Sequence, residues 1–530
     1  MTLGRTGAVV LTGMDGAVVE AEADVATGLP TFLIVGLPDA ACRQAADRIR
    51  SAAAHSGVNL PTRKIVVNLS PASLPKSGSG LDLAIAVAAL AAARSLPPAQ
   101  VAGVVHLGEL GLDGTVRPVR GVLPLVLAAA RAGVRRVVVP AANMQEASLV
   151  PDVEVLPAWS LGQVVAGHRA DAIAASGQCQ STLEGPSPWE IPDALPDLPR
   201  HGAAAVAAPP VPPDLADVAG QEEARLALEI AAAGGHHLFL VGPPGAGKTM
   251  LAERLPSLLP PLTRADALEV TSIHSVLGTL PSGILVDRAP FVAPHHGASM
   301  AAIVGGGSGA VRPGLISQAH RGVLFLDEAP EFRPQVLQAL RQPVESGRVV
   351  VARARESVCF PAQFQLVLAA NPCPCGKGHG KGRDCTCHPR ARRDYLGRLV
   401  GPLLDRVDLQ LQVPAVTLAG LSSGPGESSA VVAARVAQAR EVQRVRYAGT
   451  PWQVNAHVPG SALRRGPDAT PSSARVDLDR ALDRGVLTLR GYDRVLRLAQ
   501  TVRDLAGGGV PRRDDVGTAL TLRAHGAVAI

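Results

Sequence analysis

The stretch HHLFLVGPPGAGKTMLAERL, residues 236–255, decides the fold. It joins an apolar segment that favours a buried strand to a glycine-rich turn, and a helical pattern follows at once. Residues 242–249 fit the pattern GxxxxGK[ST], in which backbone N–H groups of the turn and of the helix start bind phosphate oxygens. Because the flanking strand and helix are those that this mechanism needs, the sequence predicts a phosphate-binding loop.

Two side chains of this loop have distinct predicted roles. The Lys248 ammonium would reach the β and γ phosphates of ATP, and the Thr249 hydroxyl would be a ligand of Mg²⁺. We therefore expect ATP and Mg²⁺ to bind here. The predicted nucleotide-binding residues of the loop are Gly242, Pro243, Pro244, Gly245, Ala246, Gly247, Lys248 and Thr249.

Polar residues follow two further apolar segments. In RGVLFLDEAP, residues 321–330, Asp327 would hold Mg²⁺ and Glu328 would orient and deprotonate the attacking water. Asn371 ends the strand-like segment LVLAAN and could hold the same water. The alternatives are two acids at a solvated strand end and an ordinary loop amide.

Composition indicates a globular chain with several cores. The 530 residues are 47% hydrophobic and 18% charged but only 2% aromatic, and about three domains are expected at this length. No apolar run reaches the ~20 residues of a membrane span, and the N-terminus lacks a secretory pattern, so the cytoplasm is the expected compartment. Of seven cysteines, four lie in residues 373–387, which is unlike a secreted disulfide framework.

Changes in pattern along the chain predict four segments. Residues 1–170 mix short valine-rich strands with alanine-rich helices, so an α/β or α+β domain is expected there. Nine prolines in residues 186–213 indicate a spacer, placed at 171–213. Residues 214–420 predict a parallel sheet with crossover helices, and residues 421–530 are mostly helical.

The four clustered cysteines form two C-x-C pairs, Cys373 with Cys375 and Cys385 with Cys387. Four thiolates could close a tetrahedral structural zinc site, although the spacing is one residue short of the usual C-x₂-C. His379 and His388 are possible substitute ligands, and free thiols are the alternative.

The segment SGRVVVARARESVCFPAQF predicts a β-hairpin before the Asn371 strand. Arg353 and Arg355 alternate with alanines and would project from one face, which suits contact with a nucleic-acid backbone. An edge strand protected by charge is the alternative. The segment from Cys373 to Arg398 carries seven Lys or Arg against two Asp, which suggests further phosphate contacts or a solvated basic loop.

The runs at residues 217–260, 291–332, 371–376 (NPCPCG) and 401–409 (GPLLDRVDL) resemble the magnesium-chelatase-like AAA+ ATPases of the ComM/YifB family, and the resemblance covers essentially the whole chain. The resemblance implies an AAA+ fold with a C-terminal helical lid, usually a hexameric ring with ATP between subunits. It implies that Arg406, in LLDR, is an arginine finger that reaches the next subunit, the alternative being an ion pair with Asp405 or Asp408. It also implies that Arg490, or else Arg494, acts from a second sensor helix.

Two further features belong to this resemblance. Residues 108–143 resemble the proteolytic domain of Lon, but Leu125 stands where that family has its lysine base, and no lysine lies between Lys76 and Lys248. Ser77 and Ser79 do not clearly reproduce the nucleophile, so we expect a domain without proteolytic activity. The adjacent His295 and His296, in FVAPHHGAS, are typical of the family but have no chemistry that the sequence explains.

The resemblance leaves two main functions open. One is a helicase that acts on single-stranded, forked or branched DNA, as in branch migration during recombination or natural transformation. The other is a chelatase-like ATPase that remodels a protein for metal insertion. The basic insertions and the lack of a D-x-S-x-S motif favour DNA. We expect no membrane partner.

Overall fold

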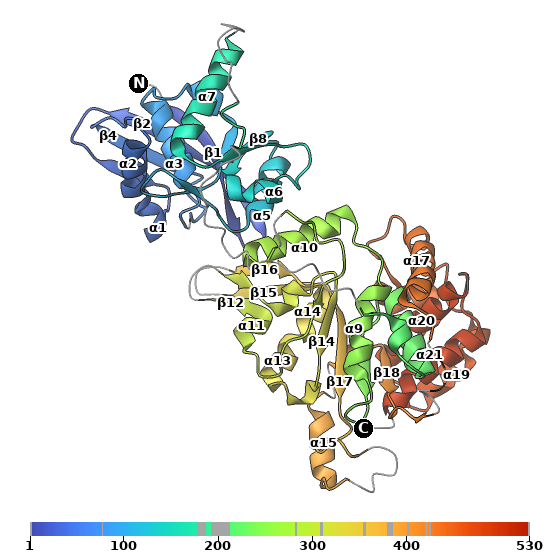
Figure 1. Cartoon of the computed structure of the whole chain (residues 1–530). Coiled ribbons are helices and arrows are strands. Elements are labelled where there is room, and N and C mark those ends of the chain that lie inside the picture. Colours follow the sequence, from blue (N-terminus) through green and yellow to red (C-terminus); the bar gives the residue numbers. More distant parts are fainter. Residues whose placement is uncertain are drawn as a thin grey trace. The chain divides into compact units, whose positions relative to one another are not determined.

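The structure is a computed structural model. It describes residues 3–76, 78–176, 187–191, 213–280, 283–307, 311–352, 357–378, 385–399, 403–418, 422, 424 and 426–527. These form two compact units, one from residues 1–208, 267–286 and 308–312 and the other from the rest. The helices and strands of both units are labelled in Figure 1.

The first unit is built on a mixed seven-stranded sheet of order β3-β4-β2-β1-β5-β8-β9. Antiparallel pairing joins β1 to β2 and β2 to β4, and the other neighbours are parallel. The strands are β1 (Gly4–Thr12), β2 (Asp15–Ala26), β3 (Phe32–Val35), β4 (Lys64–Ser70), β5 (Val104–His106), β8 (Arg136–Pro140) and β9 (Glu154–Ala158).

Helices pack on both faces of this sheet because successive strand side chains point to opposite faces. Ala8 and Val10 of β1 belong to the core that contains α3 (Asp82–Ala92), whereas Val9 between them belongs to the core that contains α5 (Val122–Arg131). Every residue of α3 is buried. The smaller elements are α1 (Ala40–Arg43), α2 (Ala45–His55), α4 (Pro98–Val101), β6 (Glu109–Leu110), β7 (Val116–Arg117), α6 (Met144–Ala147) and α7 (Leu161–Ala175).

The first unit also contains most of helix α10 (Arg264–Leu277), from Ala267 onward. Leu268 packs against the α5 core, Ser275 donates its hydroxyl hydrogen to Glu146, and the Gly121 N–H donates to the Ser275 carbonyl over 3.2 Å. The sequence places these residues within the 214–420 segment, so in the folded chain part of that segment belongs to the N-terminal unit.

The second unit contains a five-stranded sheet of order β11-β14-β17-β10-β18, in which every pairing is parallel. The strands are β10 (Leu238–Val241), β11 (Phe291–Val292), β14 (Val323–Leu326), β17 (Gln365–Ala370) and β18 (Leu409–Gln412). The mixed α/β organisation and the parallel sheet predicted from the sequence are confirmed.

Both faces of this sheet are covered, as the continuous apolar strands predict. Leu238 and Leu240 of β10 join the core formed with α8 (Glu222–Gly234), α9 (Lys248–Leu258) and the C-terminal helices. Phe239 and Val241 join a second core on the other face, to which the remaining elements contribute. These are α11 (Met300–Val304), α12 (Leu315–Gln318), α13 (Pro334–Ala339), α14 (Arg341–Ser346) and α15 (Pro389–Gly397).

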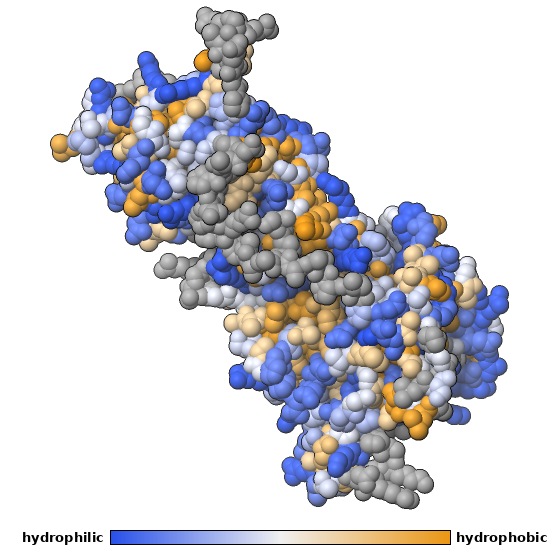
Figure 2. Space-filling model, in the orientation of Figure 1, coloured by the Kyte–Doolittle hydropathy of each residue, from blue (hydrophilic) through white to orange (hydrophobic). Residues whose placement is uncertain are grey.

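The segment predicted to be a hairpin forms the antiparallel strands β15 (Arg348–Ala352) and β16 (Ser357–Pro361). The chain ends in a helical region of α17 (Ser429–Arg446), α18 (Gly460–Arg465), α19 (Ser472–Asp483), α20 (Leu489–Leu505) and α21 (Arg513–Ala527). Hydrophilic side chains dominate the visible edge of this region around α19 (Figure 2), where Asp477 pairs with Arg513. Among the described residues, no helix is long and apolar enough to cross a membrane.

Candidate nucleotide and metal site

The predicted catalytic residues follow three neighbouring strands. The phosphate loop comes after β10, Asp327 and Glu328 after β14, and Asn371 after β17, and the order β14-β17-β10 makes these strands adjacent. Because the strands are parallel, their carboxyl ends lie along one edge, where open α/β sheets bind ligands. The fold therefore brings together residues that are up to 129 positions apart in the sequence.

Glycines give the phosphate loop its shape. Gly245 and Gly247 have φ values of +75° and +86°, and α9 begins directly after Gly247. A Cβ on Gly242 would lie only 2.2 Å from the Val413 carbonyl oxygen, so the loop can pass the end of β18 only with glycine there. The Gln221 side-chain amide donates to the Ala246 carbonyl over 2.7 Å and steadies the loop from outside.

Lys248 points back into the loop. Its ammonium donates to the carbonyl oxygens of Gly242 at 2.7 Å and Pro243 at 3.0 Å, and to Asn371 Oδ1 at 3.2 Å. Burial lowers the pKa of Lys248, an effect that the carboxylates of Asp327 and Glu328 partly offset. The direct contact between Lys248 and Asn371 places this amide, which the sequence predicts to hold the attacking water, within the phosphate site.

Thr249 and Asp327 supply the oxygen donors expected for Mg²⁺. The Thr249 hydroxyl donates to Asp327 Oδ2, with 2.8 Å between the oxygens. Adjacent ligands of an octahedral Mg²⁺ ion, each at about 2.0–2.1 Å, lie about 2.9 Å apart. The hard oxygen donors and their separation both fit this ion.

Glu328 has an unusual backbone for a residue with a side chain, with φ of +48°. Positive φ at a non-glycine residue costs free energy and occurs preferentially at functional sites. The Glu328 N–H donates to Asp327 Oδ1 over 2.8 Å, which holds the turn after β14. The two carboxylates follow the same strand but have different neighbours, Thr249 for Asp327 and His296 for Glu328.

His296 lies beside Glu328, a neighbour that the sequence alone does not reveal. His296 Nδ1 is 3.6 Å from Glu328 Oε2, and its ring packs against His295, with centroids 4.2 Å apart. Both side chains of the His296–Glu328 pair are exposed. The only sequence signal was the histidine pair after β11, and the parallel pairing of β11 with β14 is what brings it to Glu328.

The predicted arginine finger, Arg406, forms an ion pair within its own chain. Its Nη2 atom lies 2.5 Å from Glu345 Oε1 at the end of α14, and only 14% of its side chain is exposed. The sequence alternative named Asp405 or Asp408 as the partner, so the observed pair differs from it.

The two candidate sensor arginines on α20 have different surroundings. Arg490 is 71% exposed, with its guanidinium 4.0 Å from Asp405, and is therefore accessible. Arg494 is 14% exposed and lies 2.5 Å from the buried carboxylate of Asp408, so it is committed to the core. Burial alone would raise the pKa of Asp408, but the Arg494 charge and the hydrogen bond with His236 outweigh it and hold that pKa well below its usual range. This contrast favours Arg490 of the two.

The four clustered cysteines converge. The Sγ atoms of Cys373, Cys375 and Cys385 are 3.4–3.6 Å apart in pairs, and that of Cys387 completes a group within 4.8 Å. His388 instead caps α15, where its ring accepts a hydrogen bond from the Arg390 N–H. Arg353, Arg355, His379 and Ser77 lie outside the described residues.

In the first unit the described residues do not assemble a serine–lysine pair at the positions named above. Ser79 donates its hydroxyl hydrogen to Glu109, and Leu125 is buried in the α5 core. Lys76 is fully buried and donates to the carbonyl of Pro71. Of the two candidate serines only Ser79 is described, and its hydroxyl contacts a carboxylate and not a lysine base.

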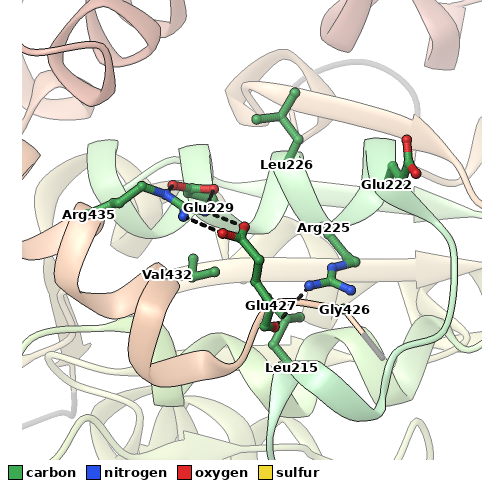
Figure 3. A pocket seen from close by; sticks show the side chains of 9 residues that line it. All are labelled: Leu215, Glu222, Arg225, Leu226, Glu229, Gly426, Glu427, Val432 and Arg435. Atoms are coloured by element: carbon green, nitrogen blue, oxygen red, sulfur yellow. Dashed lines mark hydrogen bonds and ion pairs between the residues drawn. The ribbon is translucent and has the colours of Figure 1, made fainter. Parts of the chain in front are cut away.

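A pocket of about 430 Å³ lies between α8 and α17 (Figure 3). Arg435 of α17 lies between Glu229 of α8 and Glu427, with nitrogen–oxygen distances of 2.6–2.9 Å. Arg225 donates to the Glu427 carbonyl over 2.9 Å. Arg435 thus ties α17 to α8 through Glu229, and Arg225 of α8 binds the main chain at Glu427.

Comparison with known families agrees with this geometry. The family model "Magnesium chelatase, subunit ChlI" matches residues 214–421, "Subunit ChlI of Mg-chelatase" matches 21–143, and the subunit's C-terminal model matches 426–523. The fold and the phosphate loop thus define a magnesium-chelatase-like protein of the AAA+ ATPase class, for which ATP and Mg²⁺ are the implied ligands.

Relatives of similar length show to which family within this class the chain belongs. The chain is 49% identical to an uncharacterized protein of Mycobacterium tuberculosis, covering 99% of this chain and 100% of that protein. It is 39% identical to YifB of Escherichia coli, over 97% and 95%, and 39% identical to competence protein ComM of Haemophilus influenzae, over 93% and 92%. The chain belongs to the ComM/YifB family of magnesium-chelatase-like proteins.

Proposed function

We propose that this protein is an ATP-hydrolysing ring motor that acts on DNA, as a ComM-like helicase that promotes branch migration during recombination or natural transformation. The observation that carries the ATPase part is the convergence of Lys248, the Thr249–Asp327 pair, Glu328 and Asn371 at three adjacent strand ends. The similarity to competence protein ComM supports the DNA part.

Each of these residues has a defined task in hydrolysis. Lys248 exchanges its hydrogen bonds to the loop carbonyls for bonds to phosphate oxygens. Asn371, whose side-chain oxygen accepts a hydrogen bond from Lys248 in this structure, holds the attacking water. Glu328 takes a proton from that water. Thr249 and Asp327 hold Mg²⁺, which when bound offsets charge on the phosphate oxygens.

The proposal also covers the assembly. The chain forms a hexameric ring, the N-terminal unit has a Lon-like fold without proteolysis, and α17–α21 act as a lid. In the ring Arg406 leaves Glu345 and reaches the γ-phosphate bound by the next subunit. Because the Arg406–Glu345 pair is within one chain, ring closure must exchange one anionic partner for another.

Basic surface near the site supports DNA as the partner. Helix α15 carries Arg390, Arg392 and Arg393, of which Arg390 and Arg393 are exposed. Arg353 and Arg355 would add two cations between β15 and β16. Such side chains suit the phosphate backbone and would bind with little sequence preference.

A second candidate is a chelatase-like ATPase that remodels a protein partner for metal insertion. All three matching family models describe the magnesium-chelatase subunit ChlI, which favours this reading. The two candidates share the ATPase site and differ in what stimulates it.

The two proposed functions can be distinguished by measuring whether DNA stimulates ATP hydrolysis. Wild-type protein should hydrolyse ATP faster with single-stranded, forked or four-way-junction DNA at low salt. Replacing Arg353 and Arg355 with alanine should remove the stimulation, keep basal hydrolysis, and reduce the log–log salt slope of DNA binding by up to ~2. If none of these DNAs stimulates wild-type hydrolysis, the protein-remodelling function replaces the DNA motor.

A further inference from the structure

The cysteine cluster lies where the nucleotide site joins α15. Cys373 is fully buried and comes two residues after Asn371, whereas Cys385 and Cys387 directly precede the cap of α15. The sulfur atoms of these four cysteines all lie within 4.8 Å of one another, and this is the group that could hold a metal ion among the residues that the structure describes.

The distances between the sulfurs match a bound ion better than a disulfide. A disulfide bond is about 2.05 Å long. Four sulfurs at about 2.3 Å from one tetrahedral zinc ion lie about 3.8 Å apart. The three separations of 3.4–3.6 Å are close to this value, and the group contains no carboxylate or imidazole.

The turn around Cys373 is built like a metal-binding turn. The Gly376 N–H donates to the Cys373 carbonyl over 2.9 Å, and the Gly378 N–H donates to the Cys373 sulfur over 3.1 Å. A Cβ on Gly378 would lie 2.9 Å from that sulfur, so a larger residue would disturb this bond. N–H donors to a thiolate orient it and compensate its charge.

Charge around the cluster fits the same ion. Zinc with four thiolates carries a net charge of −2, which is stable only with compensating cations or hydrogen-bond donors nearby. Among the described residues, Lys377 comes two positions after Cys375, and Arg392 Nε donates to the Cys387 carbonyl over 3.4 Å. Soft thiolate ligands in a tetrahedral group select zinc over Mg²⁺ or Ca²⁺.

The cluster is connected to both sides of the phosphate site. A Cβ on Gly376 would lie 2.7 Å from Pro244 Cγ, so the cysteine turn packs directly on the phosphate loop. Tyr395 of α15 is buried, and burial raises its pKa to about 12, an effect that the adjacent backbone of Asn371 partly offsets. Linking Cys373 and Cys375 to Cys385 and Cys387 would therefore hold Asn371 between the loop and α15.

We propose that Cys373, Cys375, Cys385 and Cys387 bind one structural zinc ion, which fixes the turn after Asn371 against the phosphate loop. The ion takes no part in the chemistry. The metal assignment rests on the cysteines alone, whereas its effect on nucleotide also rests on the proposed ATPase function.

Metal content tests the assignment without any activity measurement. Protein purified without chelators should contain about one zinc per chain, and cobalt in its place should give the thiolate charge-transfer and visible bands of tetrahedral cobalt. Cys385→Ser should lose most of the zinc. Cys359→Ser is the matched control, because Cys359 is an exposed thiol on β16 outside the cluster, and should keep it.

The coupling to the nucleotide site needs a second readout. Removing zinc from the folded wild type, or the Cys385→Ser change, should weaken ATP binding several-fold, and zinc added back to the wild type should restore it. If Cys385→Ser does not fold, the presence or absence of the thiolate–cobalt bands in the wild type decides whether the cysteines bind metal. Wild-type protein with almost no zinc and no thiolate–cobalt band would overturn the proposal, as would equal zinc in Cys385→Ser and wild type.

Discussion

Lys248 and Glu328 share one site but serve different steps. Lys248 lies inside the phosphate loop, where its ammonium donates to two loop carbonyls and to Asn371. Glu328 lies at the end of β14, in an exposed position that a water molecule can reach. Loss of the first should therefore affect binding, and loss of the second should affect chemistry.

We predict that Lys248→Ala weakens ATP binding more than about tenfold, because a charged partner of the phosphates is lost. Glu328→Gln should bind ATP like the wild type but lower the hydrolysis rate by about 10²–10⁴, the contribution of a general base. Binding of a fluorescent ATP analogue and phosphate release measure the two effects. Hydrolysis by Glu328→Gln at the wild-type rate would remove Glu328 as the base.

His296 gives a second prediction at this scale. Its ring nitrogen, 3.6 Å from Glu328, can orient the carboxylate that receives the proton. We expect His296→Ala to lower kcat roughly threefold to tenfold, as the loss of one interaction of about 1 kcal/mol would, while the Kd for ATP stays the same. His296→Asn, which keeps a polar group, should recover part of the rate.

The control for this prediction is His295→Ala. His295 packs on His296, but its Nδ1 accepts a hydrogen bond from the Gly297 N–H. If His295→Ala and His296→Ala lower kcat equally, the histidine pair only shapes the turn, and His296 has no special relation to Glu328.

Motif and strand-end reasoning could predict the residues of the phosphate site but only some of their contacts. The apolar runs before Asp327 and Asn371 predict that each of these residues follows a strand. The His296–Glu328 contact depends on the pairing of β11 with β14, and sequence periodicity does not define strand order. The Arg406–Glu345 pair joins residues far apart in the sequence, and local pattern gives no signal for such a contact.

At the level of elements, one arginine joins α17 to α8. Arg435 forms bidentate contacts with Glu229, whose side chain is only 11% exposed, and with the more exposed Glu427. Glu229 is mostly buried, so removing Arg435 would leave its carboxylate without this bidentate partner. The loss should lower the stability of the folded chain.

We predict that Arg435→Met destabilises the protein by about 1–3 kcal/mol, the cost of leaving a partly buried charge unpaired. Thermal unfolding of the full chain should show a lower Tm. Arg444→Met is the matched control, because Arg444 pairs with Glu441 on the exposed face of the same helix and should change little. Equal changes in Tm for both variants would mean that the Arg435 network does not hold α17.

Local sequence pattern is sufficient to predict some helices and strands and their burial, but not the unit in which each one packs. The apolar run of β10 predicts a strand covered on both faces, and its alternate residues do enter two cores. Helix α10 has an ordinary helical pattern, but its membership of the N-terminal unit depends on contacts such as that between Ser275 and Glu146. Such long-range contacts leave no local signal.

At the level of the whole molecule, variants of Arg406 test the proposal that the chain forms a ring with ATP bound between subunits. A residue that acts in trans should be needed for hydrolysis but not for ATP binding, because it stabilises charge in the transition state. We predict that Arg406→Ala subunits and Glu328→Gln subunits, each inactive alone, recover part of the hydrolysis rate when mixed. Confirmed mixed rings without any recovery would place Arg406 within its own subunit.

The central claim is that ATP hydrolysis at this site drives movement on DNA. The most direct measurement follows a labelled four-way junction incubated with the protein and ATP. We predict that wild-type protein converts the junction into duplex products, and that Glu328→Gln binds the junction without converting it. Wild-type protein that hydrolyses ATP but leaves the junction intact, at low salt and over a range of arm lengths, would contradict the claim.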